Sequence, residues 1–128
     1  STDGLTSHGA NAKVEAEAAS FPASEGASCK FIEAVVAAAF GVDVRAVRSH
    51  GRGSAAEALA RQTAMYLAHV NLSLSLARVG ALFHRDRTTV AHACACIEDY
   101  RDDARFERVI ACLEAALSEW RRWHEASE

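Results

Sequence analysis

The stretch from residue 76 to residue 100 constrains the fold most, because it predicts two short amphipathic helices with a tight break between them. Apolar residues recur every three or four positions in each half, at Leu76, Val79 and Phe83 and then at Val90, Cys94 and Ile97. This spacing gives each helix one apolar stripe. The polar residues His-Arg-Asp at 84–86 separate the stripes. Two helices joined by so short a break indicate a helix-turn-helix.

Both helices carry a residue that suits their N-terminal cap. Ser75 precedes the first helix, and Asp86 can cap the second by accepting from the amide of Thr88 or Thr89. The second helix then begins with three polar residues, Arg87 followed by the two threonines. The first turn of the second helix is where a helix-turn-helix presents side chains to the edges of DNA bases.

The rest of the chain favours an all-α helical bundle, because few stretches alternate between apolar and polar residues. Residues 1–27 are rich in Ala, Ser, Gly and Glu, and we expect a mobile tail there. We expect the folded domain over residues 28–124 and a short C-terminal end over 125–128. No apolar run reaches the length of a membrane span and no signal-peptide pattern opens the chain, so we expect no membrane partner.

Four further helices are predicted around the helix-turn-helix. The first begins at about Ser28, and Gly41 suits the position after its C-terminus. Its predicted buried face comprises Ile32, Val35, Val36, Ala39 and Phe40. Asp43 caps a short helical turn, and Ser54 with Glu57 forms a capping box at the start of a helix that ends near Asn71. The buried face of that helix comprises Ala60, Ala64, Leu67 and Ala68. Asp102 or Asp103 caps the last helix, whose stripe is Phe106, Val109, Ile110, Leu113, Leu117, Trp120 and Trp123.

The charge is distributed unevenly along the chain. Residues 41–92 contain seven Arg and three acids, a net +4, whereas residues 1–40 carry −3 and residues 93–128 carry −4, which sum to the formal charge of −3. The helix-turn-helix therefore lies in the basic third. Arginine suits phosphate and guanine better than lysine does, because its planar group donates two parallel hydrogen bonds. We predict that Arg48, Arg52, Arg61 and Arg85 contact phosphates or the minor groove.

The cysteines and histidines do not predict a metal or catalytic site. Cys29, Cys94, Cys96 and Cys112 each fall in a predicted helix, which favours reduced thiols in a cytoplasmic protein. His92 and Cys96 share a helix face, but Cys94 points about 200° away from His92, so a third ligand is missing. We expect no cofactor and no enzyme activity, and we expect His92 to be satisfied locally or to face phosphate.

Several segments together resemble the C-terminal DNA-binding domain of the bacterial replication initiator DnaA, over about residues 28–118. They are Ala60–Ala68, Leu76–Gly80, Phe83 and Arg85–Ala93, the last with the motif Arg-Asp-x-Thr-Thr-Val. The resemblance implies a helical bundle that binds a short asymmetric duplex site. It implies base reading in the major groove by Asp86, Arg87, Thr88 and Thr89, backbone contacts by Arg61 and Gln62, and a minor-groove loop that contains Arg52.

The sequence departs from the family pattern in three places. Arg87 stands where the family has His, Leu59-Ala60 replaces its Arg-Pro, and His84 replaces its two glycines. The sequence also contains no G-x-x-x-x-G-K-[ST] phosphate loop, and its only lysines are Lys13 and Lys30. We therefore expect a stand-alone DNA-reading domain that binds no nucleotide and lacks the initiator's ATPase.

The predicted function is sequence-specific binding of double-stranded DNA, which would regulate transcription or replication initiation by site occupancy at the bacterial nucleoid. The alternative is an acidic protein-interaction module that keeps the fold but binds a protein. Trp120 and Trp123, with Arg121 and Arg122 between them, mark the C-terminal helix as a candidate surface for a protein partner or for self-association.

Overall fold

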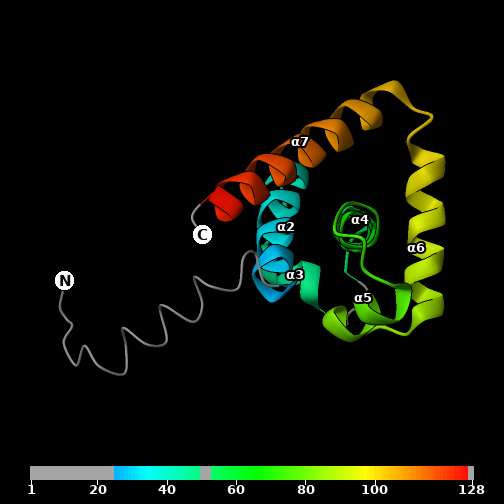
Figure 1. Ribbon diagram of the computed structural model, residues 1–128. Coiled ribbons are helices and arrows are strands. Elements are labelled where there is room, and N and C mark those ends of the chain that lie inside the picture. Colours follow the sequence, from blue (N-terminus) through cyan, green and yellow to red (C-terminus); the bar gives the residue numbers. More distant parts are fainter. Residues whose placement is uncertain (1–24, 50–52, 127–128) are drawn as a thin grey trace.

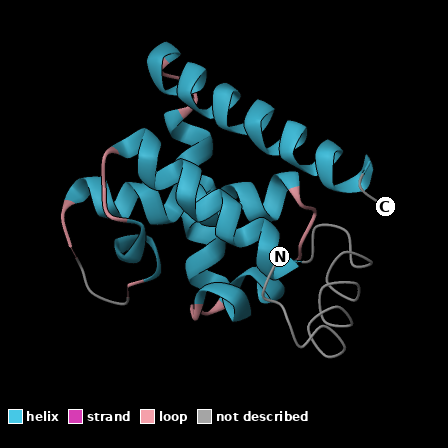
Figure 2. Cartoon of the chain, turned by 90° about the vertical axis from the view of Figure 1, so that its left-hand side faces the viewer, coloured by secondary structure: helices cyan, strands magenta, loops and turns pink. Residues whose placement is uncertain are grey.

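The computed structural model describes residues 25–49 and 53–126, and these residues form six helices and no strand (Figures 1 and 2). The helices are α2 (Glu25–Phe40), α3 (Val44–Arg48), α4 (Ala55–Asn71), α5 (Leu76–Phe83), α6 (Arg87–Tyr100) and α7 (Ala104–Ala126). The predicted all-α class is confirmed. Over this part of the chain, no helix combines the length and apolarity that crossing a membrane requires.

Helix α4 is the centre of the bundle and contacts each of the other five described helices. Figure 1 shows it nearly end-on, with the other helices around it. It begins at the predicted capping box, where the Ser54 hydroxyl accepts from the Glu57 amide at 3.1 Å and the Glu57 carboxylate accepts from the Ser54 amide at 2.9 Å. The predicted face of Ala60, Ala64, Leu67 and Ala68 is fully buried. Three small side chains on one face let neighbouring helices approach closely.

Helix α2 differs from its prediction in where it begins and in which residues it buries. It begins at Glu25, three residues before Ser28, and Glu25 accepts a hydrogen bond from Arg78 of α5 at 2.5 Å. Residues 1–24 lie outside the described part, so the predicted tail is not described. At the other end Ala39, which we expected to be buried, is exposed. The prediction was wrong because α2 packs against three helices, α3, α4 and α7, so its buried side is not a single stripe.

The buried residues of α2 show the same shift. Ile32 and Val36 are buried as predicted, and Val35 and Phe40 are partly buried. Cys29, Glu33 and Ala37, which the stripe did not include, are also buried. The helix ends at Phe40, and Gly41 follows it with a φ of +68°, the left-handed conformation expected of a glycine after a helix C-terminus.

Helix α7 lies across the end of the bundle opposite α5 (Figures 1 and 2). Asp103, not Asp102, caps it by accepting from the amides of Arg105 and Phe106 at 2.9 and 3.0 Å. Ile110, Leu113 and Leu117 of the predicted stripe are buried, and Phe106 and Val109 pack against the core. The helix continues to Ala126, past the predicted boundary at residue 124.

The two tryptophans of α7 have different surroundings. Trp120 stacks on Phe31 of α2 with the ring centres 4.9 Å apart, so it belongs to the packed interior. The side chain of Trp123 is 68% exposed. A surface role for this end of the helix therefore falls on Trp123 and not on Trp120.

Candidate nucleic-acid interface

The start of α6 presents three polar side chains to solvent. Asp86 is the N-cap, and its carboxylate accepts from the Thr89 amide at 2.8 Å, as predicted. Hydrogen bonds from the amide and the hydroxyl of Thr89 lower the pKa of Asp86, so the carboxylate is charged at neutral pH. Arg87, Thr88 and Thr89 are exposed. The first turn of α6 is therefore anchored at its cap and open on its outer side.

The other side of α6 fixes the direction in which this turn points. Val90, Ala93 and Ile97 are buried, and α6 packs on both α4 and α5. Cys94, which the predicted stripe contained, is only half-buried, and Ala93 takes its place. A helix held along one side by α4 and α5 keeps the residues of its opposite side directed outward.

The turn between α5 and α6 depends on a close approach of the backbone at Gly80. The Arg85 amide donates to the Gly80 carbonyl at 2.8 Å, and a β-carbon added at Gly80 would overlap the Arg85 carbonyl oxygen. His84 ends α5 in a left-handed conformation with φ of 58° and ψ of 46°. Histidine tolerates this region better than most residues that carry a β-carbon. The turn therefore closes through a left-handed residue at 84 and the close approach of Arg85 to Gly80.

Two arginines meet at the C-terminal end of α3. Arg61 of α4 donates to the Ala46 carbonyl at 3.0 Å, and Arg85 of the turn donates to the Ser49 carbonyl at 2.5 Å. Burial, and then the positive charge of Arg85, lower the pKa of Arg61. The two guanidinium groups therefore lie close enough to repel each other, which makes this corner attractive to an anion.

Arg48 has a partner that we did not predict from the sequence. Its Nε donates to both carboxylate oxygens of Glu33 at 2.8 Å, and Glu33 is only 4% exposed. The pairing joins residues fifteen positions apart, so no local pattern could show it. The sequence held one signal of a buried carboxylate. Glu33 lies four residues from both Cys29 and Ala37, so the three share one side of the helix, and that side is buried.

The family model of the bacterial DnaA protein helix-turn-helix matches residues 29–97, more than half of the 128 residues. The chain belongs to this family. The match runs from the first turns of α2 to Ile97 of α6 and so contains the whole interface described above. The chain is accordingly a DNA-binding helix-turn-helix domain, and its partner is double-stranded DNA. No curated protein matches the chain.

The remaining predicted contacts of this DnaA-type domain are less sharply placed. Gln62 is half-buried on α4 beside Arg61, and His92 is exposed on α6, one turn after Thr88. The Nε2 of His92 lies 3.6 Å from the Cys96 sulfur. Arg52 lies outside the described residues, so its predicted minor-groove contact stays a prediction. The Asp86 carboxylate already accepts the capping hydrogen bond from the Thr89 amide, so a base contact would use its remaining lone pairs.

Nothing in the described residues groups three or more metal-ligating side chains. All four cysteines are free, and burial raises the pKa of the Cys29 thiol to about 11 and raises the pKa of the Cys94 thiol. These two thiols are therefore protonated at neutral pH and poor nucleophiles.

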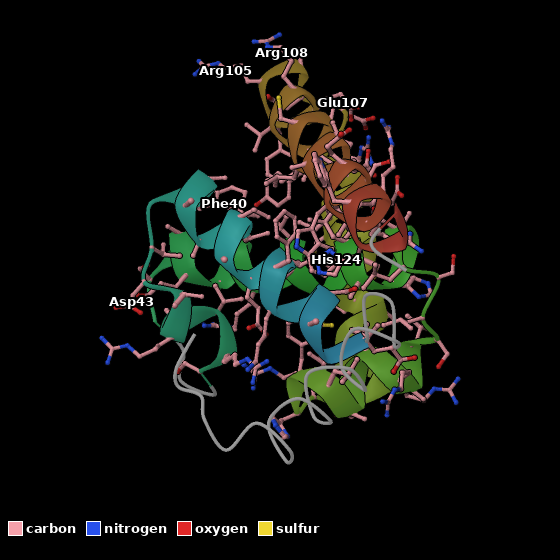
Figure 3. All side chains as sticks on the ribbon, turned by 60° about the vertical axis from the view of Figure 1, so that its left-hand side comes forward. Phe40, Asp43, Arg105, Glu107, Arg108 and His124 are labelled. Carbon is pink, nitrogen blue, oxygen red and sulfur yellow. The ribbon has the colours of Figure 1, made fainter. Side chains whose placement is uncertain are left out.

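The acidic C-terminal part of the chain, from Ala93 onward, lies largely away from the interface of this DnaA-type domain. Its described residues run from Ala93 in α6 to Ala126, mostly in α7, at the end of the bundle opposite α5. In Figure 3 the start of α7, marked by Arg105 and Arg108, lies well apart from Asp43 at the N-terminal cap of α3. The overall charge of −3 therefore does not describe the surface that α3, α5 and the start of α6 form.

Proposed function

We propose that this chain recognises a specific duplex sequence by placing the first turn of α6 in the major groove. The observation that carries the proposal is the exposure of Arg87, Thr88 and Thr89 on a helix start that Asp86 caps and whose other side is buried. Base edges in the major groove distinguish all four base pairs, so side chains held there supply sequence information.

Each exposed side chain has a role that follows from its chemistry. Arg87 pairs with a guanine through O6 and N7, the most frequent specific contact of an arginine. The methyl groups of Thr88 and Thr89 suit the thymine methyl, and their hydroxyls suit base edges. Asp86 orients this turn and offers an acceptor to a cytosine amino group. Arg87 replaces the family's His, so the preferred site differs from the initiator's own at one base pair.

The corner at α3 supplies the contacts that position the domain on the duplex. Arg61 and Arg85 are fixed there by main-chain carbonyls, and a phosphate group would relieve the repulsion between them. Gln62 and His92 extend the backbone contacts along α4 and α6, and Arg52 reaches the minor groove. Such contacts add affinity and register but no sequence information.

A domain of this kind acts by occupying its DNA site, without hydrolysing a nucleotide. The occupied site controls transcription or the initiation of replication at the bacterial nucleoid. The rival reading is a protein-interaction module, for which the exposed Trp123 would be the natural contact.

The test is a selection of bound sites from random duplex DNA, followed by fluorescence anisotropy on the selected site and on an unrelated duplex at several salt concentrations. The proposal expects a selected site bound at least 10³-fold tighter than unrelated duplex, the low end of known specific binding, with affinity that falls steeply as salt rises. Absence of any salt-sensitive binding at micromolar protein would favour the protein-interaction module. Equal affinity for all duplexes would leave DNA binding in place and contradict sequence reading.

A further inference from the structure

A buried carboxylate lies behind the interface and contacts one of its arginines. Glu33 of α2 is 4% exposed, and Arg48, the last residue of α3, donates its Nε–H to both carboxylate oxygens at 2.8 Å. A buried carboxylate is stable only with such a partner. The contact therefore fixes one edge of the Arg48 guanidinium on the inner side of α3.

The other edge of the same guanidinium faces outward. The Arg48 side chain is 47% exposed, and within the described residues its two terminal nitrogens make no hydrogen bond. These nitrogens carry four N–H donors in the planar arrangement that matches a phosphate group. Arg48 thus has one edge saturated by protein and one edge available to a ligand.

The position of Arg48 places that available edge at the DNA-binding corner. Arg48 lies between Ala46 of α3 and the C-cap Ser49, the two residues whose carbonyls accept from Arg61 and Arg85. Arg85 directly precedes Asp86, the cap of the recognition helix. Arg48 is therefore held at the point where α3, α4 and the helix-turn-helix meet.

We propose that Glu33 is a positioning residue for DNA binding, which orients Arg48 so that its terminal nitrogens contact a backbone phosphate. The inference rests on the proposed function, because it assigns Arg48 to the same interface. Glu33 itself touches no DNA. It replaces the water that would otherwise solvate Arg48 and holds the side chain in one orientation, so less conformational freedom is lost when the phosphate binds.

This role makes a prediction opposite in sign to simple electrostatics. Removing a negative charge near the interface should tighten DNA binding if charge alone matters, because the domain becomes more positive. If Glu33 positions Arg48, then Glu33→Gln should weaken binding, because the guanidinium loses its charged anchor while the fold keeps an acceptor of the same shape. Glu25→Gln is the matched control, since Glu25 is also on α2 and pairs with an arginine, Arg78.

The experiment is anisotropy with the full chain on its selected duplex at several salt concentrations, with circular dichroism to verify folding. Glu33→Gln should weaken binding by about threefold to tenfold and reduce the slope of log affinity against log salt by about one, the value for one phosphate contact. Glu25→Gln should not weaken binding. Arg48→Ala should lose as much as Glu33→Gln, and the double variant should lose no more than Arg48→Ala alone, because both changes remove one contact.

Arg48→Lys keeps the charge opposite Glu33 and serves if Glu33→Gln fails to fold. A lysine has no second edge to offer, so the salt slope should again fall by about one. Unchanged or tighter binding by Glu33→Gln, or an unchanged slope in Arg48→Lys, overturns the positioning role. If the unaltered chain shows no salt-sensitive binding to any duplex, it is the proposed function that fails.

Discussion

Two corners of the molecule are built around arginines, and they use this residue in opposite ways. At the junction of α6 and α7, Arg101 donates to Glu107 at 2.6 and 2.8 Å, to Glu114 at 3.2 and 3.3 Å and to the Tyr66 hydroxyl at 2.9 Å. At the end of α3, Arg61 and Arg85 donate to neutral main-chain carbonyls.

The pKa values follow these partners. Hydrogen bonds from Arg101 to Glu107, Tyr66 and Glu114 raise the pKa of Arg101, whereas burial and the charge of Arg85 lower the pKa of Arg61. The charge of Arg101 is compensated by two carboxylates, whereas Arg61 lies beside a second arginine, an arrangement that favours an anion. A count of arginines therefore does not locate an anion-binding surface, because the charged groups around each arginine decide how far its charge is compensated.

The largest expected effect is on stability, around Arg101 at the junction of α6 and α7. Arg101→Ala leaves Glu107 and Glu114 without their shared partner, so the free energy of unfolding should fall by about 2 kcal/mol, less than for a fully buried pair. Urea unfolding measures it, and DNA affinity of the folded protein should stay within about twofold, in contrast to changes at α3. Arg105→Ala, at an exposed position in the first turn of α7, is the control and should change little.

The same corner predicts a pH dependence. Arg101 lowers the pKa of Glu107 below its ordinary value of 4.5. A carboxyl whose pKa is lowered by folding contributes stability above its ordinary pKa, and that contribution is lost as the pH falls through the lowered value. The stability difference between the unaltered chain and Arg101→Ala should therefore be full at pH 7 and shrink as the pH falls below the ordinary pKa of 4.5 toward the lowered one. A difference that stays constant down to pH 3 would show that the pairing is not electrostatic.

A smaller effect is expected at the α3 corner, and it concerns binding. Arg61→Ala should weaken all duplex sequences by a similar factor, about fivefold, and lower the salt slope by about one, since a phosphate contact carries no sequence information. Anisotropy on the selected site and on unrelated DNA measures both quantities. Loss of preference at one base pair would instead assign Arg61 to base reading.

The smallest effect is expected from Leu59→Arg, in the second turn of α4, which introduces the arginine of the family pattern. Leu59 is half-buried against the core, so an arginine there must lay its aliphatic stem on the core and extend its charge outward. Affinity should rise by about twofold on all sequences, with a small loss of stability from the altered packing. An unchanged affinity in a folded variant would show that an arginine at position 59 of α4 does not reach the duplex.

Features set by neighbours in sequence were predictable, and those set by distant segments were not. The caps at Ser54, Ser75 and Asp86 each depend on a side chain and an amide three residues away, and all three were predicted and are present. The Glu33–Arg48 pair and the Arg85–Ser49 contact join residues 15 and 36 positions apart. Ala39 was placed on the wrong side of α2, because periodicity cannot tell how many helices pack against a face.

The candidate site follows the same division. Arg87, Thr88 and Thr89 could be named from the cap and the motif, and their exposure agrees with that choice. The sequence also marked Arg48, Arg61 and Arg85 as candidates for DNA contact. It could not show which carbonyl or carboxylate accepts a hydrogen bond from each of them. The left-handed conformation of His84 could not be predicted from its neighbours, since a histidine stands where a glycine would have indicated it. This conformation follows from the closure of the turn against Gly80.

The central claim is that α6 reads bases while the α3 corner holds the backbone, and Arg87→Ala tests it most directly. Anisotropy is measured on a selected site and on each of its single-base variants. We expect Arg87→Ala to lose about 1–3 kcal/mol on the best site and much less on unrelated duplex, and to flatten the preference at one base pair. Arg87→His should shift that preference toward the family's own site. If Arg87→Ala weakens every sequence equally and leaves base preference intact, Arg87 contacts phosphate and α6 does not read bases as proposed.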